Sequence, residues 1–178
     1  GGGFFELAGQ QVAFMGRLNI DGTVDTPFNP AANSDVCFLA VQPDGKILVG
    51  GAFSTLGGQT RTRVSRLNAD GTVDPSFNPQ ANGTVHSLAV QEDGRVLVGG
   101  EFTRMNGQPR NRICRLDING SLDISFNPGA NSTVYSLVTQ ADGKILVGGI
   151  FTTLGGQPHN RIGWLKADGS LDTSFNPG

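Results

Sequence analysis

One stretch decides the fold of this chain: residues 44–51, with the sequence DGKILVGG. It returns as DGRVLVGG at residues 93–100 and as DGKILVGG at residues 142–149, so each copy begins 49 residues after the previous one. Repetition at a fixed spacing of this size is the signature of a protein built from repeated structural units. The fold can therefore be worked out for one unit and then copied.

A second block has the same spacing. Its sequence is RLNADGTVDPSFNP at residues 66–79, and related sequences stand at residues 17–30, 115–128 and 164–177. The two blocks together divide the 178 residues into four parts. We assign them as the second half of a first unit and three complete units: residues 1–30, 31–79, 80–128 and 129–178.

Each unit contains short segments rich in β-branched and aromatic residues, separated by turn residues, which is the pattern of β-strands. In the first complete unit there are four, at about residues 36–42, 46–53, 63–68 and 72–77. The second segment has Ile47, Leu48 and Val49 in succession, which is typical of a strand covered on both faces. We therefore expect the first two strands to be the inner ones.

Two turns in every complete unit carry Asp-Gly or Asn-Gly, the pairs that favour β-hairpins. Pro43 precedes one of them, and proline suits a type I turn whose glycine closes a three-residue loop in the left-handed region. In the second hairpin a loop of this length places Leu67 opposite Val73. The same register predicts three ion pairs: Arg17–Asp25, Arg66–Asp74 and Arg115–Asp123.

Four antiparallel strands in about 40 to 50 residues, with apolar inner strands, describe the blade of a β-propeller. The sequence therefore predicts an all-β protein, a β-propeller with four-stranded antiparallel blades and an incomplete ring of three full blades plus half a blade. A β-trefoil also contains three four-stranded repeats of similar length and stays open as an alternative. The extra half unit counts against it.

The composition excludes several other classes of protein. Glycine accounts for 27 of the 178 residues, about twice its usual share of roughly 7%, and helix-favouring residues are scarce, so we expect almost no helix. The net charge of −2 provides no basic surface for nucleic acid. No apolar run approaches the ~18 residues that a membrane-spanning helix needs.

The repeated blocks resemble the delta-60 repeat family of bacterial β-propeller repeats. The resemblance covers essentially the whole chain and is clearest over residues 134–137, 140–149, 151–157 and 165–175. It implies a secreted or surface-attached bacterial protein without an assigned biochemical activity. The strand plan is also similar to that of the NHL repeat, whose propellers serve mainly as binding platforms and occasionally as enzymes. The chain departs from the pattern at residues 11–14, QVAF, where a later unit has PRNR.

A residue that recurs in every unit is expected to serve the unit itself, because every unit solves the same packing problem. A ligand site is expected where the units differ. On the innermost strand one equivalent position varies strongly, from Cys37 to His86 to Tyr135. We expect these side chains at one height around a central channel. Two potential ligands and a phenol are too few for a metal site of three or four donors.

Between the second and third strands of each complete unit we expect a longer polar loop, at residues 54–62 and 103–111 in the first two. At this long-loop end of the units, Arg61, Arg110 and His159 also vary, and we expect them near the loop tips. Their groups suit the carboxylate or hydroxyl groups of a glycan or a peptide. The candidate ligand-binding residues are therefore Arg61, Arg110, His159, His86 and Tyr135. The recurring arginines are expected instead to donate hydrogen bonds to loop carbonyls: Arg63, Arg112 and Arg161.

Other motifs are assigned to the fold. No helix follows the glycine pair Gly50-Gly51, so the pair favours close sheet packing or a bulge over a phosphate-binding loop. The Asp-Gly-x-x-Asp pattern lacks the third carboxylate and the bidentate glutamate of a calcium loop. Cys37 and Cys114 occupy unequal positions and are interpreted as free thiols. We expect no metal, no cofactor and no catalytic residue. One phenylalanine per unit should fill the core: Phe77, Phe126 and Phe175.

The sequence favours a non-catalytic extracellular β-propeller module for binding, adhesion or assembly. Repeat arrays with open ends expose a strand edge and an apolar face, so we expect further blades of the same polypeptide, or another copy of the chain, to complete the ring. A glycan or peptide ligand is the other expected partner. Two alternatives stay open: a propeller lyase or hydrolase that uses His86, Tyr135 or His159 in the central channel, and a structural segment of a surface fibre.

Overall fold

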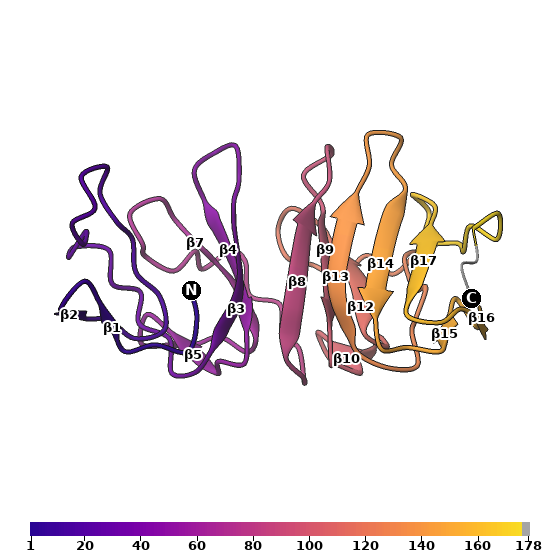
Figure 1. Cartoon of the computed structure of the whole chain (residues 1–178), viewed down its shortest axis with the longest axis horizontal. Coiled ribbons are helices and arrows are strands. Elements are labelled where there is room, and N and C mark those ends of the chain that lie inside the picture. Colours follow the sequence, from indigo (N-terminus) through magenta and orange to yellow (C-terminus); the bar gives the residue numbers. More distant parts are fainter. Residues whose placement is uncertain (176–178) are drawn as a thin grey trace.

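The computed structural model describes residues 1–175, which form β-strands, turns and loops and contain no helix. In Figure 1 the units follow one another along the molecule, from the indigo N-terminal end to the yellow C-terminal end, and the described residues form no closed ring. This arrangement confirms an all-β, incomplete β-propeller. We name its units half-blade 1 (residues 1–30), blade 2 (31–79), blade 3 (80–128) and blade 4 (129–178).

Residues 1–175 form no helix that is long and apolar enough to cross a membrane.

Each complete blade is built on a three-stranded antiparallel sheet with the most apolar strand in the middle. The sheets are β3 (Val36–Val41), β4 (Ile47–Gly51) and β7 (Val64–Leu67) in blade 2; β8 (Val85–Val90), β9 (Val96–Gly100) and β12 (Ile113–Leu116) in blade 3; and β13 (Val134–Thr139), β14 (Ile145–Gly149) and β17 (Ile162–Leu165) in blade 4. The middle strand β9 is buried along its whole length, as predicted. Because the blades are separate sheets and not hairpins that close one barrel, the trefoil alternative is wrong.

The fourth segment of each blade differs from the prediction of a full strand. In blade 2 it forms a single bridge to the third strand, between Leu67 and Val73. Just beyond, Asp74 Oδ1 accepts hydrogen bonds from the backbone N–H and the hydroxyl group of Ser76, at 2.9 and 2.6 Å. This side chain competes with a strand for the backbone, and the chain turns. The main sheet of each complete blade therefore has three strands and one bridged segment instead of four strands.

A short hairpin occupies the loop between the second and third strands of every unit, where the sequence suggested only a polar loop. The hairpins are β1 (Glu6–Leu7) with β2 (Gln10–Gln11), β5 (Thr55–Leu56) with β6 (Gln59–Thr60), β10 (Arg104–Met105) with β11 (Gln108–Pro109), and β15 (Thr153–Leu154) with β16 (Gln157–Pro158). Gly57 and Gly58 have φ angles of 56° and 70°, as a type I′ turn requires. Half-blade 1 keeps this geometry despite its different sequence, with φ of 46° at Ala8 and 77° at Gly9.

The loops between the first and second strands have the predicted length of three residues. Gly45 N–H donates to the carbonyl oxygen of Gln42 at 2.9 Å, Gln42 N–H donates to Lys46 at 2.7 Å, and the φ of Gly45 is 81°. The loops that join β3 to β4, β8 to β9 and β13 to β14 all lie at the top of Figure 1, which we call the turn end. The short hairpins lie at the bottom, which we call the long-loop end.

The hydrophobic core lies largely between neighbouring blades. Leu48 and Val64 of blade 2 pack in one buried cluster with Val85 and Leu88 of blade 3. Gly50 permits this approach, because a Cβ there would lie only 2.8 Å from Val85 Cγ1. The predicted role of this glycine in close packing is confirmed, and the packing joins two blades.

The second glycine of each pair acts within its own sheet. A Cβ on Gly51 would collide with the carbonyl oxygen of Asp35. At this point the register of β3 against β4 shifts between Val36 and Phe38, which leaves Cys37 as the extra residue of a β-bulge. The alternative prediction for the glycine pair, a bulge, is therefore confirmed as well.

In half-blade 1, blade 2 and blade 3, an arginine ties the unit to the next one at the turn end. Arg66 Nε donates to Asp74 Oδ2 at 2.9 Å, and its Nη1 donates to the carbonyl oxygen of Ile118 in blade 3 at 2.8 Å. The guanidinium carbon lies 4.6 Å from the ring centre of Phe77. The other two predicted ion pairs and their carbonyl acceptors in the following blade are Arg17 with Asp25 and Ala69, and Arg115 with Asp123 and Ala167. All three predicted ion pairs are confirmed.

Candidate functional site: the inner-strand cluster

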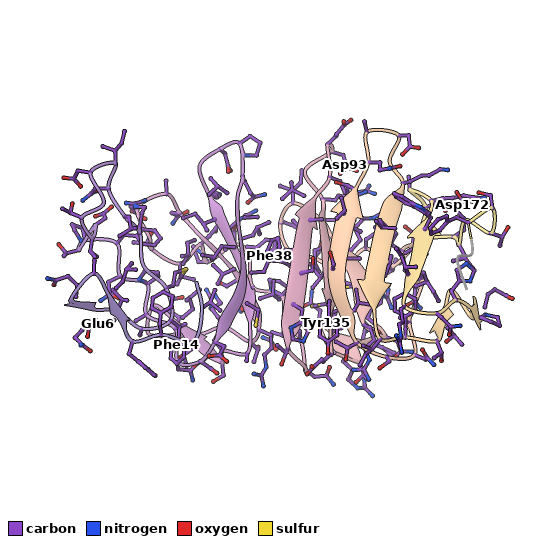
Figure 2. The ribbon with its side chains drawn as sticks, viewed as in Figure 1. Glu6, Phe14, Phe38, Asp93, Tyr135 and Asp172 are labelled. Carbon is purple, nitrogen blue, oxygen red and sulfur yellow. The ribbon has the colours of Figure 1, made fainter. Side chains whose placement is uncertain are left out.

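The first strand of each complete blade, which we call its inner strand, has a bulge whose extra residue varies strongly between the units. Cys37 in β3, His86 in β8 and Tyr135 in β13 are each the extra residue of a β-bulge, so they occupy equivalent positions in their blades. A bulge turns the side chain of its extra residue away from the regular alternation of the strand. Figure 2 shows Tyr135 toward the long-loop end, on the opposite side of the molecule from Asp93.

The side chain of His86 contacts both the ring of Tyr135 and a carboxylate. The ring centres of His86 and Tyr135 are 5.2 Å apart, with 56° between the ring planes. His86 Nε2 lies 3.1 Å from Glu101 Oε1. A carboxylate oxygen accepts hydrogen bonds, so this contact matches the tautomer in which the imidazole carries a proton on Nε2. We call Cys37, His86, Glu101 and Tyr135 the inner-strand cluster.

Cys37 is exposed, but its surroundings disfavour the thiolate form. Burial raises the pKa of the Cys37 thiol, and the negative charges of Asp35 and Glu101 raise it further. The thiol is therefore protonated at neutral pH, and a protonated thiol is a poor nucleophile. The cluster thus offers an aromatic face, an imidazole and a carboxylate without a thiolate.

Sequence reasoning missed Glu101, although a signal was present. Glu101 directly follows β9, at the position held by Ala52 in blade 2 and Ile150 in blade 4. This position varies between the units as strongly as the bulge position does. The Arg112 guanidinium donates a hydrogen bond to the backbone carbonyl of Glu101 and so helps to fix its place.

The other candidates, Arg61, Arg110 and His159, do not lie at exposed loop tips, and this part of the prediction is wrong. Their exposed fractions are only 7%, 8% and 4%. Each arginine donates from Nη1 to the carbonyl oxygen of the residue before it, at 2.8 and 2.7 Å. His159 Nε2 lies 3.2 Å from the carbonyl oxygen of Phe175. The short hairpins form the loop tips, and Arg61, Arg110 and His159 lie at the bases of these hairpins. Ligand binding by the three residues stays a prediction.

Two of the three recurring arginines hold loop carbonyls, as predicted, and for Arg161 this role stays a prediction. Arg63 and Arg112 donate to the backbone carbonyls of Ala52 and Glu101. Both have positive φ angles, 69° and 68°, a region in which residues other than glycine are uncommon. The side-chain hydrogen bond helps to hold the backbone in this conformation.

The carboxylates of the Asp-Gly-x-x-Asp turns are occupied by neighbouring groups. Asp70 Oδ1 accepts hydrogen bonds from the backbone N–H and hydroxyl group of Thr72, at 2.9 and 2.6 Å. Asp74 is held by Ser76 and Arg66. Over residues 1–175 there is no group of three or more His, Cys, Asp or Glu side chains that could hold a metal ion.

A groove of about 650 Å³ opens between blades 2 and 3 at the turn end, away from the cluster. Its lining residues include Arg66, Ser76, Asp93, Arg95, Asp117 and Asn119. Arg95 Nε lies 3.6 Å from Asp93 Oδ2 and 3.5 Å from Asp117 Oδ1. Because these charges neutralise one another, we place the candidate site at the inner-strand cluster and not in this groove.

Comparison with known families finds three matches along the chain, at residues 42–77, 91–126 and 140–175. All three are to one family, described as a domain of unknown function (DUF5122) beta-propeller, and together they cover more than half of the chain. The chain belongs to this family. Each DUF5122 match begins 49 residues after the previous one. A search of curated proteins gave no match.

Each DUF5122 match covers the later part of a blade, and the bulge residue of that blade lies before the match. A match begins at the glutamine before the first hairpin loop and ends at the phenylalanine after the bridged segment. Cys37, His86 and Tyr135 lie outside the matches, and Glu101 lies inside one. The family pattern therefore describes the blade scaffold, and most of the cluster stands on the strand that precedes it.

Proposed function

We propose that this chain is a non-catalytic binding module within an extracellular β-propeller, and that the inner-strand cluster contacts its ligand. The main support is the meeting of His86, Glu101 and Tyr135 on a scaffold that is otherwise repeated from blade to blade. Side chains that served only the packing of the blade would recur with it, as the glycine pair does. The resemblance to delta-60 and NHL repeats supports the extracellular setting and a role in binding or adhesion.

The chemistry of the cluster suits a glycan or a peptide. Tyr135 is 49% exposed, and its aromatic face is a surface for a sugar ring or an apolar side chain. His86 and Glu101 stand beside it with a hydrogen-bond donor and acceptors for hydroxyl or amide groups. Because the Cys37 thiol is protonated, the cluster has groups for holding a ligand and no strong nucleophile.

An immobilised panel of oligosaccharides and peptides tests the proposal. We expect the wild-type chain to be retained by members of the panel. Tyr135→Ala should weaken retention about tenfold, because an aromatic contact is worth roughly 1.4 kcal/mol, and Tyr135→Phe separates the ring from its hydroxyl group. Val41→Ala is the control, since Val41 is 73% exposed on β3 but lies at the turn end. Retention that survives both Tyr135→Ala and His86→Ala, or an absence of retention by the whole panel, contradicts the proposal.

One observation favours a second function. The hydrogen bond between His86 and Glu101 orients the imidazole, as in sites that use histidine as a general acid or base. A propeller lyase or hydrolase would use this pair at the inner strands. Product analysis of the retained oligosaccharides separates the two functions. A binding module leaves them intact, whereas an enzyme releases products that disappear in His86→Gln while retention persists.

A further inference from the structure

Blades 2 and 3 each have a face that the next blade covers, and we call this face, together with its equivalent in blade 4, the forward face. Leu48 and Val64 lie on this face of blade 2, Leu97 and Ile113 lie on this face of blade 3, and all four are fully buried. They pack into clusters with apolar residues of the following blade. The forward face of blade 4 carries the equivalent residues: Val138, Leu146, Gly148, Ile162, Trp164 and Phe175.

No described residue buries the forward face of blade 4 in the same way. Leu146 and Ile162 are partly exposed, although their equivalents are fully buried, and Val138 is 51% exposed. Figure 1 shows the sheet of β13, β14 and β17 at the C-terminal end of the array. Contiguous apolar faces of this kind are rarely left in water and mark interaction sites.

Gly148 gives this face a shape that fits an inner strand. A Cβ on Gly50 or Gly99 would lie 2.8 or 2.9 Å from a valine Cγ1 of the following blade. At Gly148 the nearest atom would be Ser136 Cβ in its own sheet, at 3.8 Å. The notch that accepts a valine and a leucine in the other blades is therefore formed in blade 4, and no described side chain fills it.

We propose that the forward face of blade 4 docks a further blade of the same repeat, carried by the same polypeptide. The inner strand of that blade presents a β-branched residue and a leucine to the notch at Gly148. Such a blade would continue an interface that the chain already uses between blades 2 and 3 and between blades 3 and 4. A second copy of the chain fits less well, since the corresponding valines of its described inner strands are already buried: Val36, Val85 and Val134.

The interface of blade 4 differs from the others in one contact. Where Arg66 and Arg115 donate to a carbonyl of the next blade, blade 4 has Trp164. The indole packs edge-on against Phe175, with ring centres 6.4 Å apart. The turn of the docked blade is therefore held by apolar contact with an indole instead of by a guanidinium.

Trp164 is the single tryptophan of the chain and reports directly on docking. The experiment fuses a second copy of residues 81–129, which contain no tryptophan, directly after Gly178, so that the 49-residue spacing continues. Docking should move the Trp164 emission to shorter wavelength and protect it from acrylamide quenching. It should also raise the melting temperature by about 5 °C or more, since the added interface stabilises the whole array.

Gly148→Val is the matched control. In the unfused chain it should leave folding and emission unchanged, because space is open around Gly148. In the fused protein it should abolish the shift, because the new side chain fills the notch. Unchanged emission in the fused protein overturns the proposal whether or not the added blade folds, and so does a shift that survives Gly148→Val. A shift in the unfused chain that depends on concentration also overturns it and assigns the face to a second copy.

Discussion

Blades 3 and 4 have nearly the same middle strand and use it differently. The sequence of β9 is VLVGG and that of β14 is ILVGG. The whole of β9 is buried, whereas Leu146 and both glycines of β14 are partly exposed. The cause is the neighbour, because blade 4 covers the forward face of blade 3 and no described residue does the same for blade 4.

The comparison shows that a single blade builds only part of its core. Val98 and Val147 point away from the forward face and are fully buried in both blades. Leu97 is fully buried and its equivalent Leu146 is not. The stability of such an array is therefore a sum of blade and interface contributions, and paired substitutions in blades 3 and 4 can separate the two.

The largest effect is expected at the phenylalanine that follows the bridged segment. Phe126 is fully buried and packs against the turn of blade 4 at Gly169, so Phe126→Ala should lower the free energy of unfolding by about 3–5 kcal/mol. Phe175 is only partly buried, and Phe175→Ala should cost about 1–2 kcal/mol. Urea unfolding followed by circular dichroism compares them. Equal losses would show that blade 4 is covered in solution.

A smaller effect is expected at the first glycine of each pair. A Cβ on Gly99 would lie 2.9 Å from Val134 Cγ1, so Gly99→Ala should destabilise the chain by about 1–3 kcal/mol. Gly148→Ala should be neutral or slightly stabilising, because glycine weakens a strand and the space is open. Thermal unfolding of the two variants measures the difference. The comparison between the blades fails if Gly148→Ala is as damaging as Gly99→Ala.

Gly149→Ala is the control for this pair of variants. Its Cβ would collide with the carbonyl oxygen of Thr133 at the bulge of its own sheet. It should therefore destabilise blade 4 strongly, with or without a neighbouring blade. Tolerance of Gly149→Ala would mean that the bulge is not needed to hold β13 on β14.

The repeat, the hairpin loops and the ion pairs could be predicted because they depend on local chemistry, such as Pro43 before an Asp-Gly turn. The fourth strand was mispredicted because the composition of residues 72–77 favours a strand. In the structure Ser76 donates two hydrogen bonds to Asp74, and these turn the chain out of the sheet. Gly57-Gly58 was a recognisable signal for a type I′ turn. Because the pair lies within a polar, glycine-rich loop sequence, this signal is easily overlooked, and the short hairpins were not predicted.

The candidate site could be predicted only in part. Comparison of the units found His86 and Tyr135, because both stand at an equivalent position of the inner strands. Their contact depends on how two blades pack, which no pattern within one blade records. Arg61 and Arg110 were expected near loop tips because the hairpins that fold them inward were missed.

The smallest expected effect concerns the aspartate at the bridged segment. Burial opposes the ionisation of Asp123, but hydrogen bonds from Ser125 and Arg115 outweigh it and lower the pKa of Asp123 to about 2. In blade 4, hydrogen bonds from Ser174 and then Lys144 hold the pKa of Asp172 well below its usual range. Both carboxylates therefore have a lower pKa in the folded chain than the ~3.9 expected when it is unfolded. The stabilisation from Asp123 is therefore present above about pH 4 and is lost as the pH falls through about 2, and that from Asp172 is likewise lost in acid.

Asp123→Asn should lower the free energy of unfolding at pH 7 by about 1 kcal/mol and flatten its decline below about pH 4. Asp172→Asn should have a smaller effect that salt reduces further, because its partner Lys144 is 42% exposed and Arg115 is only 8% exposed. Urea unfolding from neutral to acid pH, at low and high salt, measures both. A cost for Asp172→Asn that matches Asp123→Asn and resists salt would place the Lys144 pair in a buried setting, as if a further blade covered it.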